Sequence, residues 1–314
     1  MRKPSSWRWR LLVGLSVWLR RVGLYPGYEA VARWPVAKRK AIVPAPWMTH
    51  PPPAAVRIAH ETLESRDGPL ELRMFRTAPG QAPSILFIHG GGFVAGGAGA
   101  LDYLCANLCA RLGVAVASVD YRLAPDHRFP SALEDCYDAL TWVAARAPGP
   151  VAVIGDSAGG NLSAALCLLA RERGGPAIAH QTLVYPVLDA TLASPSMRTH
   201  QQYGMTYADL EGMVGLYLRE GHDPRDPLVS PIHAPDHRGL PPAFILTADC
   251  DILRDEGSRY AECLRKAGVP VRLKNYLDAT HAFLSHPKLS AAAAESLDDI
   301  VAEMGPHLRV AKAA

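Results

Sequence analysis

Short, apolar runs alternate with segments of helical periodicity between residues 84 and 304, and this alternation constrains the fold more than any other feature. The runs are typical of strands that are buried on both faces of a sheet. They lie at residues 84–89, 114–119, 151–154, 182–185, 243–247 and 271–276, with helical segments at 101–112, 131–146, 158–173, 256–267 and 289–304. The pattern predicts an α/β fold, with a mostly parallel central sheet flanked by helices on both faces.

Two segments break the alternation and predict the domain organisation. Residues 1–55 are basic and then rich in proline, and residues 189–240 are rich in Pro, His and Arg but contain no strand-like run. Inserted segments and N-terminal arms of this kind commonly form lids. We therefore expect an N-terminal cap segment at 1–55, a core at 56–188 and 241–314, and a helical cap insertion at 189–240. Within the core, residues 56–63 and 70–75 predict two strands joined by a turn at Asp67–Gly68.

The N-terminal arm carries most of the positive charge. Residues 1–40 contain ten Lys or Arg and one acidic residue, Glu29, so the arm carries +9 although the whole chain carries +3. Its apolar run, residues 11–19, is too short to span a bilayer. Arg20 and Arg21 follow the run where a signal peptide needs small residues, which argues against secretion. A lid helix and an interfacial helix on anionic lipid both fit the pattern.

Six cysteines occur without the two-residue spacing of a zinc or redox motif. Scattered cysteines in apolar contexts are expected to be buried, reduced thiols. Reduced thiols point to a reducing compartment, so we expect a cytoplasmic protein, with peripheral membrane contact through the arm as the alternative.

The pentapeptide Gly155-Asp156-Ser157-Ala158-Gly159 follows one predicted strand and precedes a predicted helix. A serine at such a sharp turn has its Oγ pushed out above the sheet, where the following helix N-terminus points. Small neighbours are needed because larger side chains would clash with the adjacent strand and helix. The context predicts that Ser157 is a nucleophile and that the Ala158 N–H is available to an oxyanion.

His89-Gly90-Gly91-Gly92-Phe93, here called the glycine loop, follows the strand-like run at 84–89. Its glycines can present bare N–H groups to a developing alkoxide. A dinucleotide fingerprint is the competing interpretation, with Asp120 as ribose ligand. Asp120 lies too far along the chain for that role, and no helix begins at these glycines, so the fingerprint is disfavoured.

Three motifs in order, HGGGF at 89–93, DYRLAP at 120–125 and GDSAGG at 155–160, resemble those of the hormone-sensitive-lipase-like esterases, bacterial family IV. The resemblance spans about residues 56–304 and implies an α/β-hydrolase fold with a helical cap. It also implies that Gly91, Gly92 and Ala158 form the oxyanion hole. His89, Gly90 and Asp156 are expected to support the site, and Tyr121 and Arg122 to brace the glycine loop.

The acid and the base should follow Ser157 in that order. Four acids compete after the run at 243–247, and they are Asp249, Asp251, Asp255 and Glu256. Asp251 matches the family's acid, although Ile252 replaces the usual proline. The last two open a predicted helix, where acids stabilise the dipole. The base is predicted to be His281, with His286 as its rival, and Ala282 replaces the glycine that usually follows it.

These residues predict a serine carboxylesterase that acts through a Ser157-His281-Asp251 triad and an acyl-enzyme. The resemblance implies short- to medium-chain acyl esters as substrates. No metal, organic cofactor or nucleic acid is expected to take part, and a homodimer is implied by the family alone. An amidase or formamidase using the same triad and a membrane-associated lipase remain open, whereas a complete triad disfavours a binding protein on an inactive hydrolase scaffold.

Overall fold

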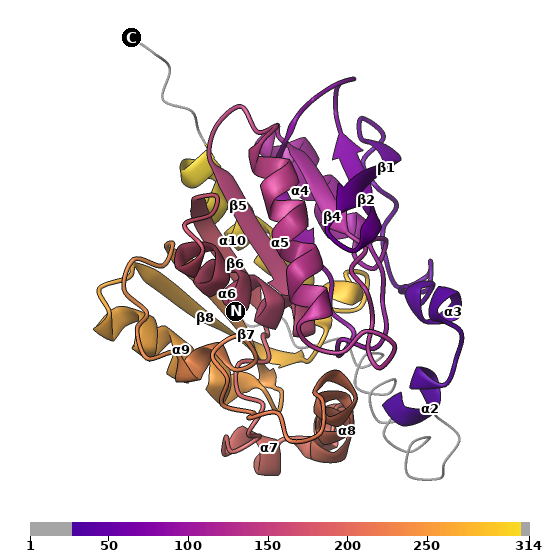
Figure 1. Ribbon diagram of the computed structural model, residues 1–314. Helices are drawn as coiled ribbons and strands as arrows, with labels where there is room; N and C mark the ends of the chain where they lie inside the picture. The colour runs from indigo at the N-terminus through magenta and orange to yellow at the C-terminus, as the bar shows by residue number, and fades with distance from the viewer. Residues whose placement is uncertain (1–26, 309–314) are drawn as a thin grey trace.

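A computed structural model describes residues 27–308 and has one eight-stranded sheet as its centre (Figure 1). The strand order is β1-β2-β4-β3-β5-β6-β7-β8. β2 is antiparallel to both of its neighbours, and every other adjacent pair is parallel. The strands are β1 (Arg57–Ser65), β2 (Gly68–Arg76), β3 (Pro83–Ile88), β4 (Ala115–Val119), β5 (Val151–Asp156), β6 (Ile178–Val184), β7 (Ala243–Cys250) and β8 (Val271–Thr280). The predicted α/β class is confirmed.

Helices cover both faces of the sheet, which explains why its central strands are apolar throughout (Figure 1). Every residue of β3, β4 and β5 is buried. Alternate residues of β3 enter two separate apolar clusters, Leu86 and Ile88 on one face and Ile85 and Phe87 on the other. α5 (Ser131–Ala144), α6 (Ala158–Glu172) and α9 (Arg254–Lys266) cover the first face, and α4 (Asp102–Leu112) and α10 (Ala291–Leu308) the second.

The start of α5 departs from what its local sequence indicates. Ser131 and Glu134 have the spacing of a capping box, in which the serine is the N-cap. In the structure Pro130 is the N-cap, Ser131 is the first helical residue, and no side chain caps the helix. The Glu134 carboxylate is instead paired with Arg66 and Arg173, at 2.5 and 2.6 Å. Two arginines from other elements have taken the carboxylate away from the helix terminus.

Helices also gather at one end of the molecule, where the segments expected to form the cap lie (Figure 1). Four of them, here called the cap helices, are α2 (Tyr28–Ala32), α3 (Val36–Lys40), α7 (Ser196–Thr199) and α8 (Tyr207–Tyr217). α2 contacts α8, so the N-terminal segment and the insertion meet. Short 3-10 helices η1 (Gln201–Tyr203), η2 (Pro231–His233) and η3 (Phe283–Ser285) complete the elements.

A third, smaller apolar cluster joins the cap helices to the core. Met197 of α7 and Leu210 and Met213 of α8 pack there with Val187 and with Ile252 and Leu253, which follow β7. This packing ties the insertion to the loop in which Asp251 lies.

The apolar run at 11–19 of the basic N-terminal arm lies outside the described residues. Between residues 27 and 308, no helix is both long enough and apolar enough to cross a bilayer. All six cysteines are free, and four of them are buried.

Candidate active site

Ser157 lies at a sharp turn between the end of β5 and the start of α6. Its φ is 55° and its ψ is −116°, a backbone conformation that is strained for a residue with a Cβ. The turn is held because the Ser157 N–H donates to the Val184 carbonyl at 2.9 Å. A Cβ on Gly155 would lie 2.2 Å from the Gly159 carbonyl oxygen, and one on Gly159 would lie 2.0 Å from that of Ile88. The close approach explains why both positions are glycine.

Ser157, His281 and Asp251 meet although they come from three separate loops. His281 Nε2 lies 3.0 Å from Ser157 Oγ, and His281 Nδ1 lies 2.8 Å from Asp251 Oδ2. A carboxylate only accepts, so Nδ1 carries the proton and Nε2 accepts from the serine hydroxyl. Asp251 is buried, and its other oxygen accepts from the Leu253 N–H at 3.0 Å. The carboxylate is thus oriented from both sides.

The competing acids and the competing base have other partners. Asp249 accepts from Asn275, at 3.3 Å, and Asp255 accepts from the Ser196 N–H, at 2.9 Å. Glu256 is fully buried and accepts from the Leu188 and Asp189 N–H groups at 2.6 and 3.1 Å. His286 Nδ1 contacts the Ala282 carbonyl oxygen at 3.2 Å. Asp255 and Glu256 do lie in the first turn of α9, but their carboxylates bind the two ends of the 188–196 loop.

The glycine loop follows β3, and its Gly90 lies against Asp156, the residue that precedes Ser157. Gly91 and Gly92 have φ values of 116° and 63°, and the Gly91 carbonyl accepts from Val94 and Ala95 within a tight turn. Neither the Gly91 nor the Gly92 N–H has an acceptor among residues 27–308. The Ala158 N–H lies at the N-terminus of α6, where helical N–H groups have no intrahelical partner.

The residues expected to support the glycine loop contact it directly, with one exception. His89 Nδ1 donates to the Gly90 carbonyl at 2.8 Å, and the Tyr121 hydroxyl donates to the His89 carbonyl at 2.8 Å. The Gly90 N–H donates to Asp156 Oδ1 at 2.8 Å. The rings of His89 and Tyr121 stack with centroids 4.1 Å apart. Arg122 was expected to brace the loop, but its guanidinium instead binds Asp135 and Asp67.

Burial sets the charge state of two of these supports. It lowers the pKa of His89 to about 4, so the ring is neutral at pH 7. It raises the pKa of Asp156 to about 6, against which the hydrogen bond from Gly90 acts in part. A carboxyl group therefore lies next to Ser157 in a setting that favours its neutral form.

Asp120, the residue that a dinucleotide site would need, is engaged elsewhere. Its carboxylate pairs with Lys40 Nζ at 2.6 Å and accepts from the Ala98 N–H at 3.2 Å. Groups of three or more His, Cys, Asp or Glu residues that could hold a metal ion do not occur within 27–308.

Sequence reasoning missed three further residues that reach the site. Tyr185, directly after β6, lies edge-on to the His281 ring with centroids 4.9 Å apart. Met213 of α8 covers Gly92 so closely that a Cβ on that glycine would lie 2.1 Å from the methionine sulfur. Arg39 of α3 is 1% exposed and hydrogen-bonds the chain just beyond the glycine loop. No local signal distinguished these residues, because each acts across a long stretch of sequence.

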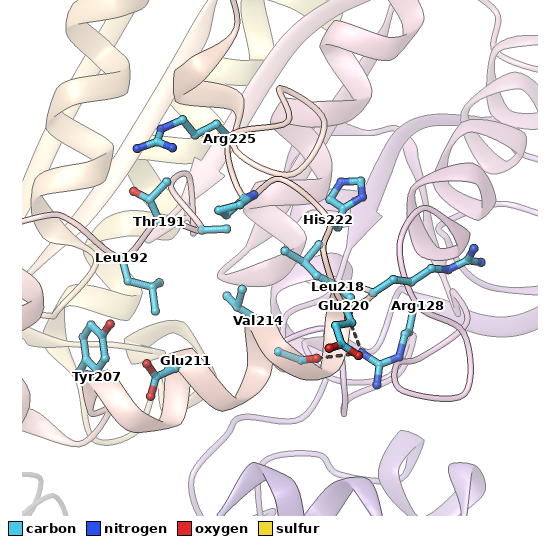
Figure 2. Close-up of a pocket in the computed structure, with 14 residues that line it drawn as sticks. Arg128, Thr191, Leu192, Tyr207, Glu211, Val214, Leu218, Glu220, His222 and Arg225 are labelled. Atoms are coloured by element: carbon cyan, nitrogen blue, oxygen red, sulfur yellow. Dashed lines mark hydrogen bonds between the residues drawn. The ribbon is translucent and has the colours of Figure 1, made fainter.

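A hollow of about 820 Å³ lies along α8, on the side of the insertion (Figure 2). Apolar Leu192, Val214 and Leu218 line it together with charged Arg128 and Arg225. Leu192 and Val214 also pack on the small cluster that contains Met213. Ser157, His281 and Asp251 are not part of its lining, so the hollow does not include these three residues.

Comparisons with known proteins agree with this fold. A family model described as the α/β hydrolase fold matches residues 85–285. The chain is 40% identical over 255 residues to LipN, a carboxylic ester hydrolase of Mycobacterium tuberculosis, an alignment covering 77% of this chain and 68% of that protein. It is 37% identical over 268 residues to an ethyl acetate hydrolase of Pseudomonas putida, covering 80% and 83%. A hyperthermophilic esterase from Pyrobaculum calidifontis superposes with a TM-score of 0.79 at 32% identity, covering 97% of this chain and 99% of that one.

Proposed function

The chain belongs to the α/β-hydrolase superfamily and, within it, to the hormone-sensitive-lipase-like esterases, and on that premise we propose that Ser157, His281 and Asp251 are its catalytic triad. The protein is a carboxylic ester hydrolase. One observation carries the assignment of residues, namely the continuous hydrogen-bonded relay from Ser157 Oγ through both nitrogens of His281 to Asp251.

In the proposed acylation step, Ser157 Oγ attacks the ester carbonyl carbon while His281 Nε2 takes the hydroxyl proton. Asp251 holds the imidazole in the required tautomer and stabilises the imidazolium that forms. His281 then gives the proton to the leaving alcohol, which departs as an acyl-enzyme remains. Water then attacks the acyl-enzyme with His281 as its base. This step releases the carboxylic acid product and regenerates the free serine.

The oxyanion of each tetrahedral intermediate is proposed to accept from the N–H groups of Gly91, Gly92 and Ala158. Removing one such donor typically costs about 3 kcal/mol of transition-state stabilisation. In support, two of these groups have no other acceptor among the described residues and the third lies at a helix N-terminus. Their position depends on Asp156 and His89, which hold Gly90 from both of its peptide groups.

We propose short- to medium-chain acyl esters as substrates, because two side chains of α8, in the insertion, pack directly on the glycine loop. Met213 touches Gly92, and the Tyr217 ring stacks on Phe93 with centroids 3.9 Å apart. Side chains in van der Waals contact with the glycine loop leave little room beside it for a long acyl chain.

The test is hydrolysis of p-nitrophenyl esters from acetate to palmitate by the wild type and by Ser157→Ala. We expect activity that peaks at short or medium chains and is abolished by the substitution. Activity that rises towards palmitate would contradict the substrate class and favour a lipase. Full activity in Ser157→Ala would contradict the mechanism, and faster turnover of a matched amide would indicate an amidase.

Two finer proposals concern partners. Peripheral contact with anionic lipid through the basic arm is tested by liposome co-sedimentation of the full chain against one lacking residues 1–26. A deletion through residue 40 would be unsuitable, because Lys40 binds Asp120 in the core.

A homodimer is supported by β8, an edge strand on which Leu277 is 52% exposed, and is tested by light scattering coupled to gel filtration.

A further inference from the structure

Arg39, in the short cap helix α3, is among the most completely buried large side chains of the described residues, at 1% exposure. A buried guanidinium is costly unless its charge and its N–H groups are satisfied. Arg39 meets that requirement because three of its four acceptors are backbone carbonyls, and two of these lie next to the glycine loop in space.

The guanidinium spans three separate segments. Nη1 donates to the Val94 carbonyl at 3.0 Å and to the Ala124 carbonyl at 2.6 Å. Nε donates to the Trp34 carbonyl at 3.1 Å, and Nη2 is paired with the Asp126 carboxylate. The planar fork of an arginine can hold such diverging acceptors at once, whereas a lysine ammonium is a single point of donation.

Both core acceptors are one step from the glycine loop. Val94, whose carbonyl Arg39 holds, donates its own N–H to the Gly91 carbonyl at 3.2 Å. Ala124, whose carbonyl Arg39 also holds, donates its N–H to the Phe93 carbonyl at 2.9 Å. Two routes therefore run from one guanidinium to the loop, each through a single residue, Val94 or Ala124.

The backbone of Arg39 adds a third contact, because its carbonyl accepts from the Gly96 N–H at 3.0 Å. The adjacent Lys40 reinforces the attachment by binding the Asp120 carboxylate, which also accepts from the Ala98 N–H. The loop needs this restraint, since Gly91, Gly92 and Phe93 all have positive φ values and such conformations persist only when their surroundings hold them.

We propose that Arg39 is a positioning residue for catalysis, by which the N-terminal cap segment fixes the N–H groups of Gly91 and Gly92 at the oxyanion. The cap segment would thus be part of the catalytic apparatus as well as a cover. This inference rests on the proposed esterase mechanism and adds to it a residue that does not touch the substrate.

The test compares Arg39→Met and Arg39→Lys with the wild type. Arg33→Met is the matched control, since Arg33 is an exposed arginine of the same cap segment. Active sites are first counted by the end point of titration with a p-nitrophenyl phosphonate, so that rates refer to folded enzyme only. The readouts are kcat/KM per titrated site and the inhibition constants of two compounds. One is a trifluoromethyl ketone, which the serine attacks to leave an oxyanion, and the other is the corresponding secondary alcohol, which has no carbonyl to attack.

We expect kcat/KM per site to fall about 10- to 100-fold in both Arg39 variants, because small misplacements of catalytic groups have effects of that order. The ketone should bind weaker by a similar factor, while the alcohol and the Arg33→Met control change little. Arg39→Lys should not restore activity, since it keeps the charge but not the fork.

Three results would overturn the inference. They are rates per site within about twofold of wild type, equal weakening of the ketone and the alcohol, or failure of both variants to give titratable protein, which would assign Arg39 to stability alone. A wild type that hydrolyses no ester would instead refute the proposed function.

Discussion

Asp156→Asn should make the protein's stability depend less on pH, because Asp156, the residue before Ser157, is a buried carboxyl. Its pKa is raised by burial from 3.8 to about 6. A carboxyl whose pKa is higher in the folded state binds its proton more tightly when folded. The stability that the protonated Asp156 carboxyl contributes is therefore fully present below the unfolded pKa. It is lost as pH rises from about 4 to about 6.

The size of the effect follows from the two pKa values. Between about pH 4.5 and about pH 8, ionisation of Asp156 should remove about 2 kcal/mol from the free energy of unfolding. Asparagine keeps an oxygen that can accept from the Gly90 N–H but does not ionise. Any fixed cost of its amide hydrogens, about 1–3 kcal/mol if they lack acceptors, is the same at both pH values and cancels in the comparison.

The assay is urea unfolding of wild type and Asp156→Asn at both pH values. We subtract the free energy of unfolding of wild type from that of the variant at each pH. This difference should be about 2 kcal/mol more favourable to the variant at the higher pH than at the lower. The control is Asp298→Asn, at a side chain that is 72% exposed, for which the relative stability should be similar at both pH values. If the difference in free energy of unfolding between Asp156→Asn and wild type did not change with pH, a raised pKa of Asp156 in the folded protein would be refuted.

Three further predictions concern the triad and its turn. Asp251→Asn should lower kcat on p-nitrophenyl acetate about ten-thousand-fold, because the amide favours the wrong tautomer of His281, and a loss below tenfold would count against its role. Gly159→Ala should lower the free energy of unfolding by at least about 3 kcal/mol in urea titrations, since its Cβ would lie 2.0 Å from the Ile88 carbonyl oxygen, and an unchanged midpoint would contradict this contact. Activity should rise from acid to neutral pH, because a histidine must be uncharged to act as a base, whereas a flat profile would exclude a histidine base.

Local patterns predicted the sheet and the serine turn well, because both depend on short stretches of sequence. A buried strand must be apolar on both faces, and the turn at Ser157 needs Gly155 and Gly159 for steric reasons that hold wherever they occur. The expected strands at 84–89, 114–119 and 243–247 agree with β3, β4 and β7 to within a few residues at their ends.

The acid could not be chosen from local sequence alone, since four carboxylates follow β7 closely. The resemblance to a family pointed to Asp251, and the structure explains the difference between the four by what each carboxylate faces. Asp251 is hydrogen-bonded to His281, while Glu256 accepts from the Leu188 N–H.

Long-range contacts account for what the sequence did not reveal. Arg39 binds carbonyl groups 55 and 85 positions further along the chain, and it was one of ten basic residues in a segment whose composition indicated a lid or a lipid-binding arm. The capping box that the spacing of Ser131 and Glu134 indicates does not form for a related reason, because the Glu134 carboxylate pairs with Arg66 of the β1–β2 turn and with Arg173 at the end of α6.

The most direct test of the account is to locate the covalent intermediate. The wild type and Ser157→Ala would be treated with diethyl p-nitrophenyl phosphate, which transfers its phosphoryl group to an activated serine, and their peptides analysed by mass spectrometry. The account predicts one diethylphosphoryl group on the wild type, on Ser157, with loss of esterase activity in proportion, and none on the variant. Inactivation with the group on another residue, or an active enzyme that stays unmodified, would contradict Ser157 as the nucleophile.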